Sequence, residues 1–155
     1  MTVRLGVISD THGLLRPEAV AALTGSELII HSGDIGSLAV LEALRSIAPV
    51  VAIRGNIDTG AWAASLQASE LVEVGEATLY VLHDLAELDF DPKAAGFQAV
   101  IAGHSHRPAI ETRNGVLYVN PGSAGPRRFS LPITLARLEV ERAEVAGRIV
   151  ELRAA

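Results

Sequence analysis

Residues 3–13, VRLGVISDTHG, are a short apolar run that leads directly into polar residues. The run from Val3 to Ile8 is short and rich in β-branched residues, which predicts a buried strand. Asp10 and His12 follow in the loop at its end. An apolar run that ends in a polar loop returns several times along the chain, and this repetition indicates a sheet whose strand ends share a polar site.

The first third of the chain alternates strands with helices. Pro17 suits the first helical position, so we expect a helix over residues 17–23. Ser37 suits the N-cap of a second helix over residues 37–47. Two further apolar runs that end in polar loops are ELIIHSGD, residues 27–34, and VVAIRGN, residues 50–56. Strands connected by helices pair in parallel through right-handed crossovers, so this order of elements predicts an α/β fold.

The second half of the chain predicts mainly antiparallel pairing. The dipeptide NG at residues 114–115 lies between two alternating segments and is the strongest short signal of a hairpin. A tight connection at residues 75–76 joins two other strands, and a short helix is expected over residues 92–95. The remaining strands are expected within residues 98–104 and residues 133–152. The pattern predicts a single domain, residues 1–155, in which two sheets pack together with helices outside.

The composition describes a globular chain and excludes several kinds of site. Of the 155 residues, 49% are hydrophobic and 20% are charged, which is typical of a folded domain. The formal net charge of −5 argues against a broad basic surface for nucleic acid, although bound cations would still permit phosphate chemistry. The absence of cysteine excludes disulfides and thiolate metal ligands. Because no apolar run approaches the roughly 20 residues of a membrane span and no signal-peptide pattern is present, we expect a cytoplasmic protein without membrane contact.

Eight polar residues follow the expected strand ends. They are Asp10, His12, Asp34, Asn56, Asp58, His83, His104 and His106. Because open α/β sheets bind ligands at the carboxyl ends of their strands, we expect these side chains to converge. Residues i and i+2 of an extended segment point to the same face, so Asp10 and His12 can reach one ion. His104 and His106 can do the same, or divide between two neighbouring ions.

The donor set favours transition metals. Carboxylate and imidazole ligands without thiolate suit Mn²⁺, Zn²⁺, Fe²⁺, Ni²⁺ or Co²⁺ better than Ca²⁺, and Mn²⁺ is the ion we expect first. The two oxygens of Asp34 allow it to bridge two cations. Glycine precedes Asp34, Asn56 and His104, and the missing Cβ permits a close approach of the backbone to a bound group.

Each motif also has a plain alternative when it is taken alone. Asp-x-His and Gly-Asp are common sequences, and a histidine at a strand end is often a packing residue. The combination of all these motifs indicates a site. His31 lies inside the second strand, so we expect it to be structural and to hydrogen-bond groups that support the ligands from behind.

The ordered blocks DTH, GD, GN-x-D, H and GHSH, followed by NPGS, resemble those of the calcineurin-like metallophosphoesterases. The resemblance runs from about Val3 to Arg128 and is greatest to the small, single-domain phosphodiesterases of bacteria and archaea. It implies a four-layer αββα sandwich with two central mixed sheets and two divalent metal ions at one end. It further implies that one ion is held by Asp10, His12 and His106, and the other by Asn56, His83 and His104, with Asp34 as the bridge.

The resemblance also implies a mechanism for a small phosphate-ester substrate. Two ions roughly 3.5–4 Å apart clamp the ester and acidify a bridging water, and the resulting hydroxide attacks phosphorus in line with the leaving group. Asp34 and Asn56 are the implied catalytic residues, since Asp34 holds both ions and Asn56 orients a phosphoryl oxygen. The NPGS segment, residues 120–123, shapes the neighbouring loop and ligates no metal.

Two positions depart from the family pattern. Ile57 stands where many relatives have a histidine that helps to protonate the leaving group, which favours phosphodiesters with good leaving groups over alkyl monoesters. Asp84 follows His83 where relatives usually have glycine, and it adds a carboxylate near the second ion. Asp58 is expected to support the ligands from behind, by orienting His12, or else to be only a turn residue.

Three alternatives stand beside a phosphodiesterase. They are a protein-binding scaffold on the same fold, like the related subunit of the eukaryotic endosomal sorting coat, a phosphomonoesterase, and a nuclease, which the acidic chain favours least. All seven ligand positions carry residues that can bind metal, which favours catalysis over a scaffold.

Trp62 suits a cleft wall, a subunit contact in a homo-oligomer or plain packing. Arg127 and Arg128 suit either an anionic substrate or solvent.

Overall fold

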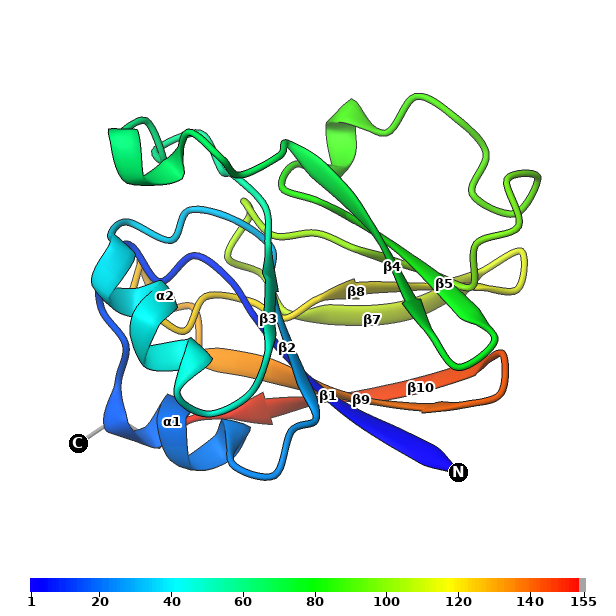
Figure 1. The fold of residues 1–155 in the computed structure, drawn as a ribbon, viewed down its shortest axis with the longest axis horizontal. Coiled ribbons are helices and arrows are strands. Elements are labelled where there is room, and N and C mark those ends of the chain that lie inside the picture. The colour runs from blue at the N-terminus through cyan, green and yellow to red at the C-terminus, as the bar shows by residue number, and fades with distance from the viewer. Residues whose placement is uncertain (154–155) are drawn as a thin grey trace.

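Ten strands in the described part of the chain, residues 1–153, form two five-stranded sheets in the computed structural model (Figure 1). Sheet A contains, in spatial order, β10 (Glu144–Glu151), β9 (Thr134–Glu141), β1 (Thr2–Ile8), β2 (Leu28–His31) and β3 (Val50–Ala52). Sheet B contains β4 (Ser69–Val74), β5 (Ala77–Leu82), β6 (Ala99–Ile101), β8 (Val116–Asn120) and β7 (Ala109–Arg113). Both sheets have parallel and antiparallel pairs, so the predicted pair of central mixed sheets is confirmed.

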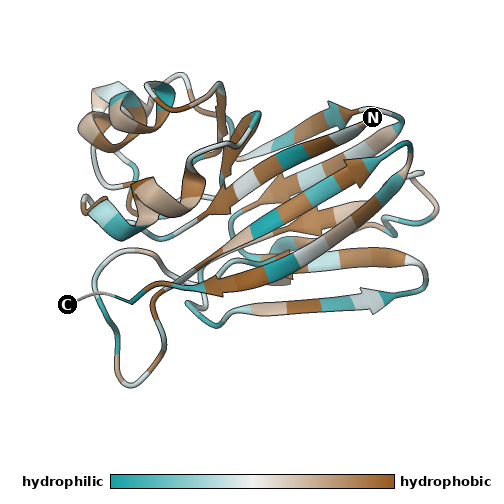
Figure 2. Cartoon of the chain, turned by 90° about the horizontal axis from the view of Figure 1, so that it is seen from below, coloured by the Kyte–Doolittle hydropathy of each residue, from teal (hydrophilic) through white to brown (hydrophobic). Residues whose placement is uncertain are grey.

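Alternating apolar residues build the core between the two sheets. Polar and apolar residues alternate along the strands (Figure 2), and successive side chains of a strand point to opposite faces. Leu5 and Val7 of β1 belong to the same buried cluster as Leu79 and Val81 of β5. Burying one such side chain contributes about 1.5–3 kcal/mol, so the two sheets are held together by the apolar faces that they share.

Two helices cover part of the outer face of sheet A. α1 (Pro17–Leu23) begins at the predicted proline, and α2 (Leu38–Arg45) begins after Ser37. Leu23 and Leu41 from these helices pack with Ile29 of β2 in a second buried cluster. In the described residues, no helix has the length and apolar character that crossing a membrane requires.

The outer face of sheet B has no α-helix among residues 1–153. The segment that follows β5, which includes the 3-10 helix η2 (Leu85–Glu87), packs there instead. The ring of Tyr80 on β5 has its centroid 5.0 Å from that of Phe90 and 5.8 Å from that of Phe97, which attaches this segment to the sheet. The fourth layer of the sandwich is therefore mainly loop. A second 3-10 helix, η1 (Ala61–Ala63), follows β3.

Two details of the expected helices are wrong. Residues 92–95 form turns rather than a helix, because Gly96, with φ +84°, ends the segment after a single turn. α2 ends at Arg45 rather than at residue 47, because the Ile47 N–H bonds to the Leu44 carbonyl in a tightened last turn.

Tight turns and parallel pairing bring the strand ends to one side of the molecule. The β7–β8 hairpin turns at Asn114 and Gly115, with φ +51° and +80°, as a two-residue turn of the predicted kind requires. β1, β2 and β3 run parallel in sheet A, and β5 and β6 run parallel in sheet B. The carboxyl ends within each of these sets therefore lie at the same edge of their sheet.

The shared core predicts unequal costs for two leucine truncations in sheet B. Leu79→Ala removes a side chain with no exposed surface and is expected to lower the free energy of unfolding by about 2–5 kcal/mol. Leu71→Ala on the neighbouring strand removes a side chain that is 55% exposed, so a change within about 0.5 kcal/mol is expected. Urea denaturation measures both, and equal losses would contradict this description of the core.

Candidate metal centre

Loops that follow five strands meet at one edge of the sandwich. The predicted site residues on these loops are Asp10 and His12 after β1, Asp34 after β2, Asn56 after β3, His83 after β5, and His104 and His106 after β6. The loops of the two sheets are bonded directly, since the His104 N–H donates to Asp10 Oδ2 at 3.1 Å. Within sheet B, the Gly103 N–H donates to the His83 carbonyl at 2.9 Å. The predicted convergence is therefore present in the structure.

The backbone of most site residues lies in the left-handed region. These residues are Asp10, His12, Asp34, His104 and His106, with φ of +54°, +46°, +59°, +71° and +64°. Side chains other than glycine seldom adopt this conformation, which costs about 1–3 kcal/mol at each position. The expectation that Asp10 and His12 lie on an extended segment is wrong. Both residues turn the chain, and the turned loop brings their side chains to one place.

Glycines let these loops approach one another closely, as expected. A Cβ on Gly103 would lie 2.2 Å from Ser9 Oγ and 2.8 Å from Asp10 Oδ2. A Cβ on Gly55 would lie 2.1 Å from the backbone nitrogen of Asp34. No side chain fits at either distance, so the absence of a Cβ allows the loops to pack against each other.

A first group of ligand atoms surrounds one oxygen of Asp10. His106 Nε2 lies 3.4 Å from Asp10 Oδ1, and His12 Nε2 lies 3.9 Å from the same oxygen. One ligand atom from each of these three residues lies within 4.8 Å of the others. This spacing leaves room for one cation between them.

A second group adjoins the first through the same carboxylate. His83 Nε2 lies 3.3 Å from Asp34 Oδ2 and 3.9 Å from Asp10 Oδ1, and this trio also meets the 4.8 Å spacing. Ser32 fixes the imidazole, because its carbonyl oxygen lies 2.8 Å from His83 Nδ1 and accepts that hydrogen. His83 Nε2 is then left to accept a proton or a cation.

Asn56 adjoins the second group closely, whereas His104 lies farther out. One end of the Asn56 amide lies 3.1 Å from His83 Nε2 and 3.2 Å from both Asp34 oxygens. With its NH₂ group there, the amide donates to these atoms; with its oxygen there, the same atoms form a cage for a cation. His104 lies at the margin with a side chain that is 49% exposed, and its Nε2 is 3.9 Å from Asp84 Oδ2. Asp84 in turn accepts the Ala86 N–H at the start of η2.

Two buried atoms of the first group have no partner among the described residues and are suited to binding a cation. Asp10 Oδ1 and His12 Nε2 are buried and have no hydrogen-bond partner among the described residues. Leaving such groups unpaired costs about 1–3 kcal/mol each, and more when the group is charged. Carboxylate and imidazole donors without a thiolate match Mn²⁺, Fe²⁺ and Zn²⁺. The residues present therefore fit a divalent transition metal.

The surroundings shift the acid–base behaviour of the four most central groups. Burial disfavours the charged form of His83, but hydrogen bonds to Asp34 and to the Ser32 carbonyl outweigh it and raise the pKa of His83. Burial also opposes ionisation of Asp34, but the bonds from His83 and from the Ile57 N–H, together with the nearby histidine charges, outweigh it and lower the pKa of Asp34. Burial raises the pKa of Asp10 and lowers the pKa of His106. A bound cation would displace the proton of His83. Metal affinity is therefore expected to decrease as the pH is lowered.

His31 lies behind the centre and links two of its loops. Its Nδ1 accepts the Gly33 N–H at 3.1 Å, and its Nε2 lies 3.0 Å from Thr11 Oγ1. The Thr11 hydroxyl donates to the Ile35 carbonyl at 2.8 Å, so His31 Nε2 must carry the hydrogen of its own bond to Thr11. Complete burial lowers the pKa of His31 to about 3, which keeps the ring neutral. These contacts agree with the structural role expected for this residue.

Asp58 holds backbone rather than a ligand ring. Its carboxylate accepts the N–H groups of Gly55, Ile35 and Gly36 at 3.0, 3.1 and 3.0 Å. These bonds join the loop after β3 to the loop after β2, at the two residues that follow Asp34. The structure thus places Asp58 behind the site, but acting through the backbone and not through His12.

The NPGS segment braces the site, as its position in the sequence suggests. Asn120 Nδ2 donates to the Gly103 carbonyl at 3.0 Å and to Ser105 Oγ at 3.1 Å. Ser123 Oγ donates to the Asp10 carbonyl at 2.9 Å. Ser105 was not among the expected site residues, because a serine has no pattern of its own and only its place between two histidines marks it.

The remaining residues singled out from the sequence lie outside the ligand set. Trp62 packs against the cluster beneath the two helices, which supports the packing role. Arg127 and Arg128 are exposed on the loop between β8 and β9. The charge of Arg128 is near enough to act against protonation of His106.

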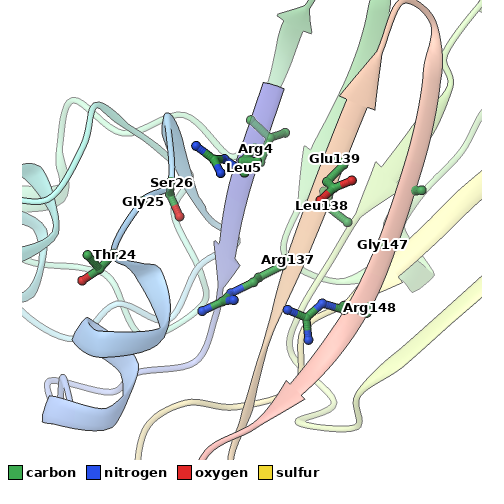
Figure 3. A pocket seen from close by; sticks show the side chains of 11 residues that line it. Arg4, Leu5, Thr24, Gly25, Ser26, Arg137, Leu138, Glu139, Gly147 and Arg148 are labelled. Carbon is green, nitrogen blue, oxygen red and sulfur yellow. The ribbon is translucent and has the colours of Figure 1, made fainter. Parts of the chain in front are cut away.

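Two cavities differ in their relation to the centre. A cavity of about 330 Å³ lies on sheet A between the loop after α1 and strands β1, β9 and β10 (Figure 3), and none of the seven expected ligands lines it. Its Arg137 and Arg148 are cross-strand partners, and Arg137 donates to the Ala22 carbonyl at the end of α1. A smaller cavity of about 230 Å³ on sheet B includes His104 and Asp84 in its walls. Only the smaller cavity adjoins the centre.

The close approach at Gly103 predicts the effect of one added methyl group. Gly103→Ala would push against Ser9 Oγ and Asp10 Oδ2, so a loss of Mn²⁺ affinity of at least about tenfold is expected in titration calorimetry. Gly147→Ala is the matched control, since its Cβ would meet only the end of the Leu138 side chain, on sheet A, at 2.4 Å. Equal Mn²⁺ affinity in both variants would contradict the crowding argument.

The buried neutral His31 predicts a pH-dependent stability. Its pKa of about 3 in the folded protein lies below the ordinary value of 6.5, so the unfolded state binds the extra proton between these values. Stability from this group is complete above pH 6.5 and is lost as pH falls toward 3. Relative to His31→Gln, the wild-type protein is expected to lose about 2 kcal/mol between pH 7 and pH 5. Denaturation in metal-free buffer measures the difference, and a flat difference would contradict the assignment.

The family of the chain follows from comparison with known proteins. Residues 3–143 match the calcineurin-like phosphoesterase superfamily domain. The chain is 34% identical over 153 residues to a probable metallophosphoesterase of Methanocaldococcus jannaschii, an alignment that covers 90% of this chain and 77% of that protein.

Solved structures give the same result for the fold. A structure described as a novel archaeal phosphodiesterase superposes with a TM-score of 0.79 at 25% identity, covering 96% of this chain and 100% of that one. Vps29 of Chaetomium thermophilum superposes with a TM-score of 0.78 at 19% identity, covering 97% and 98% of the two chains, a likeness of fold alone. With the family match over most of its length and a metal-ligand set at its strand ends, the chain belongs to the calcineurin-like phosphoesterase superfamily and is a metal-dependent phosphoesterase.

Proposed function

We propose that this protein hydrolyses small phosphodiesters at a centre of two divalent metal ions, in the cytoplasm. The observation that carries the proposal is the surroundings of Asp10 Oδ1. Three histidine Nε2 atoms, from His12, His83 and His106, lie 3.4–3.9 Å from this buried oxygen, which has no hydrogen-bond donor among the described residues. Such a gathering of electron-pair donors is stable when cations lie among them.

In this proposal the ligands divide between two ions. Asp10, His12 and His106 hold one, Asn56, His83 and His104 hold the other, and Asp34 bridges. The structure gathers Asp10, His12 and His106 in one group, which supports the first half of this division, and it gathers Asp34 and His83 with Asp10 in a second group. Asp34 Oδ2 lies 3.6 Å from His12 Nε2 and 3.3 Å from His83 Nε2, which supports Asp34 as the ligand that the two ions share. Mn²⁺ is the ion that we propose first.

Residues of the chain prepare the site for phosphate chemistry. When bound, two divalent ions neutralise the phosphoryl group and lower the pKa of the water that attacks phosphorus. The Ile57 N–H donates to Asp34 Oδ1 at 3.1 Å and fixes the Asp34 carboxylate. When the amide oxygen of Asn56 faces a cation, the amide nitrogen of Asn56 can point toward a phosphoryl oxygen. His31 and Asp58 keep the loops that carry these groups in position.

The side chain of Ile57 supports a preference for diesters. It is 41% exposed beside Asn56 and carries no proton that a leaving group could take. A diester with an acidic leaving group needs no such proton, whereas an alkyl monoester does. We therefore propose that phosphodiesters with good leaving groups react faster than monoesters.

A protein-binding scaffold is the second candidate, and the fold of Vps29 is the observation that favours it. Every ligand position of this chain carries a residue able to bind metal, and the supporting contacts of His31, Asp58 and Asn120 are in place. A scaffold has no need of left-handed backbone at five ligands. These features favour catalysis. An acidic chain also favours a small ester over nucleic acid as substrate, and a homo-oligomer remains compatible with the proposal.

The proposal predicts a specific loss on neutralising the bridging carboxylate. With Mn²⁺ added, Asp34→Asn is expected to hydrolyse bis(p-nitrophenyl) phosphate at least about 100-fold more slowly than the wild-type protein and to bind less metal by elemental analysis. Asp89→Asn, at an exposed loop position, is the matched control and is expected to keep full activity.

Two outcomes would overturn parts of this proposal. A wild-type protein that binds no metal at these residues, or an Asp34→Asn variant with undiminished turnover, would overturn the mechanism. Turnover of p-nitrophenyl phosphate that equals or exceeds turnover of the diester would overturn the diester preference alone.

A further inference from the structure

A cleft lies beside the metal centre on the outer face of sheet B, where the fourth layer is loop rather than helix. Its volume is about 230 Å³, and it is called the sheet B cleft below. The residues of its walls that matter here are Leu85, Val100, Ala102, Ala109, Tyr118 and Val119. His104, Gly103 and Ser105 also line it, so the loop that carries two of the proposed ligands forms one side of the cleft.

We propose that the sheet B cleft binds the organic substituent of the substrate, and that this substituent is a planar aromatic ring. The inference rests on the proposed phosphodiesterase function, because it assigns a place to one ester group of that substrate. A phosphate held at the centre would lie next to His104, and an ester group directed past this side chain enters the cleft. The chemical class is an aryl or nucleobase ring, and the two share a flat apolar face.

The shape of the cleft supports a ring of limited size. Small-molecule sites are concave and mainly apolar, with a few polar groups that fix orientation. Val100 and Ala102 lie beneath the cleft in the small buried cluster of this face, and Leu85 and Tyr118 pack against that cluster. A volume of about 230 Å³ suits one ring system rather than an extended chain of nucleotides.

One wall presents a flat surface. The guanidinium carbon of Arg113 lies 4.7 Å from the centre of the Tyr118 ring. Arg113 Nε also bonds to Glu111. Stacking on an aromatic or guanidinium plane is tolerant of ring identity.

The fold explains why this cleft is open. The segment from η2 to residue 98 reaches only part of the outer face of sheet B, through Tyr80, Phe90 and Phe97. Asp84 starts η2 by accepting the Ala86 N–H and thereby sets the edge of the cleft nearest His104. The residue that departs from the family pattern thus borders the proposed ring site.

The test compares two esters that share one leaving group. Phenyl p-nitrophenyl phosphate and methyl p-nitrophenyl phosphate both release p-nitrophenolate. The phenyl ester presents an aryl ring to the cleft whichever of its two ester groups enters it, whereas the methyl ester does so with only one of its two groups. The wild-type protein with Mn²⁺ is expected to show a KM about tenfold lower for the phenyl ester. Ala109→Phe, which fills the cleft from β7, is expected to raise that KM about tenfold and to leave kcat/KM for the methyl ester within about twofold.

A control variant and a binding measurement keep the test decisive. Ala146→Phe makes the same substitution at an exposed position in the sheet A cavity, and both esters are expected to react as with the wild-type protein. Calorimetry of the Mn²⁺-loaded protein with diphenyl phosphate and dimethyl phosphate measures binding without turnover. The diphenyl ester is expected to bind about tenfold more tightly, and Ala109→Phe is expected to remove that difference.

The outcomes separate the cleft from the reaction. Equal KM and equal affinity for the aryl and methyl compounds would overturn the cleft inference while leaving the phosphodiesterase function in place. No turnover of either ester, together with tighter binding of diphenyl phosphate that Ala109→Phe removes, would overturn the function and support the cleft. Equal effects of Ala109→Phe and Ala146→Phe would also overturn the inference.

Discussion

The buried carboxylate of Asp10 is the group on which the arrangement of this molecule depends. Its Oδ2 accepts the Ser9 hydroxyl at 2.7 Å and the His104 N–H at 3.1 Å, and so joins the first strand of sheet A to a loop of sheet B. Its Oδ1 is buried without a donor and faces three histidines. One side chain thereby closes the edge of the sandwich and leaves a negatively charged acceptor at the centre of the site. A buried acceptor of this kind is costly unless a cation uses it.

Around this carboxylate, strained backbone is held by many small contacts. The left-handed conformation of five ligands costs free energy at each one, and the bonds from Ser123, Asn120 and Asp58 to neighbouring backbone oppose relaxation of the loops. Strain that is fixed by its surroundings positions ligands before any ion arrives, which limits the reorganisation that binding requires. His31 serves the same end as a neutral, fully buried connector between the loops after β1 and β2.

The two outer faces of the sandwich have different consequences. Helices on sheet A extend the apolar core and support the loops that carry Asp10 and Asp34. Loop and 3-10 structure on sheet B leave a cleft beside His104, above a small buried apolar cluster. The sheet B cleft therefore lies on the face whose outer layer is loop rather than helix.

Short-range patterns were enough to foresee the strands, the hairpin at Asn114, the helix at Pro17 and the polar residues at the strand ends. Alternation, turn chemistry and capping act within a few residues, so they can be recognised in the sequence without knowledge of the fold. The family was also indicated by the sequence, because the order of the short ligand blocks along the chain can be read without the fold. The partners of Asp58, the turned backbone of Asp10 and His12, the packing of Trp62 and the cleft at Tyr118 were not legible in this way. Each depends on contacts between segments far apart in the chain, such as that of Asp10 with His104. The separation of two residues in the sequence does not show which buried atom such a contact leaves unpaired.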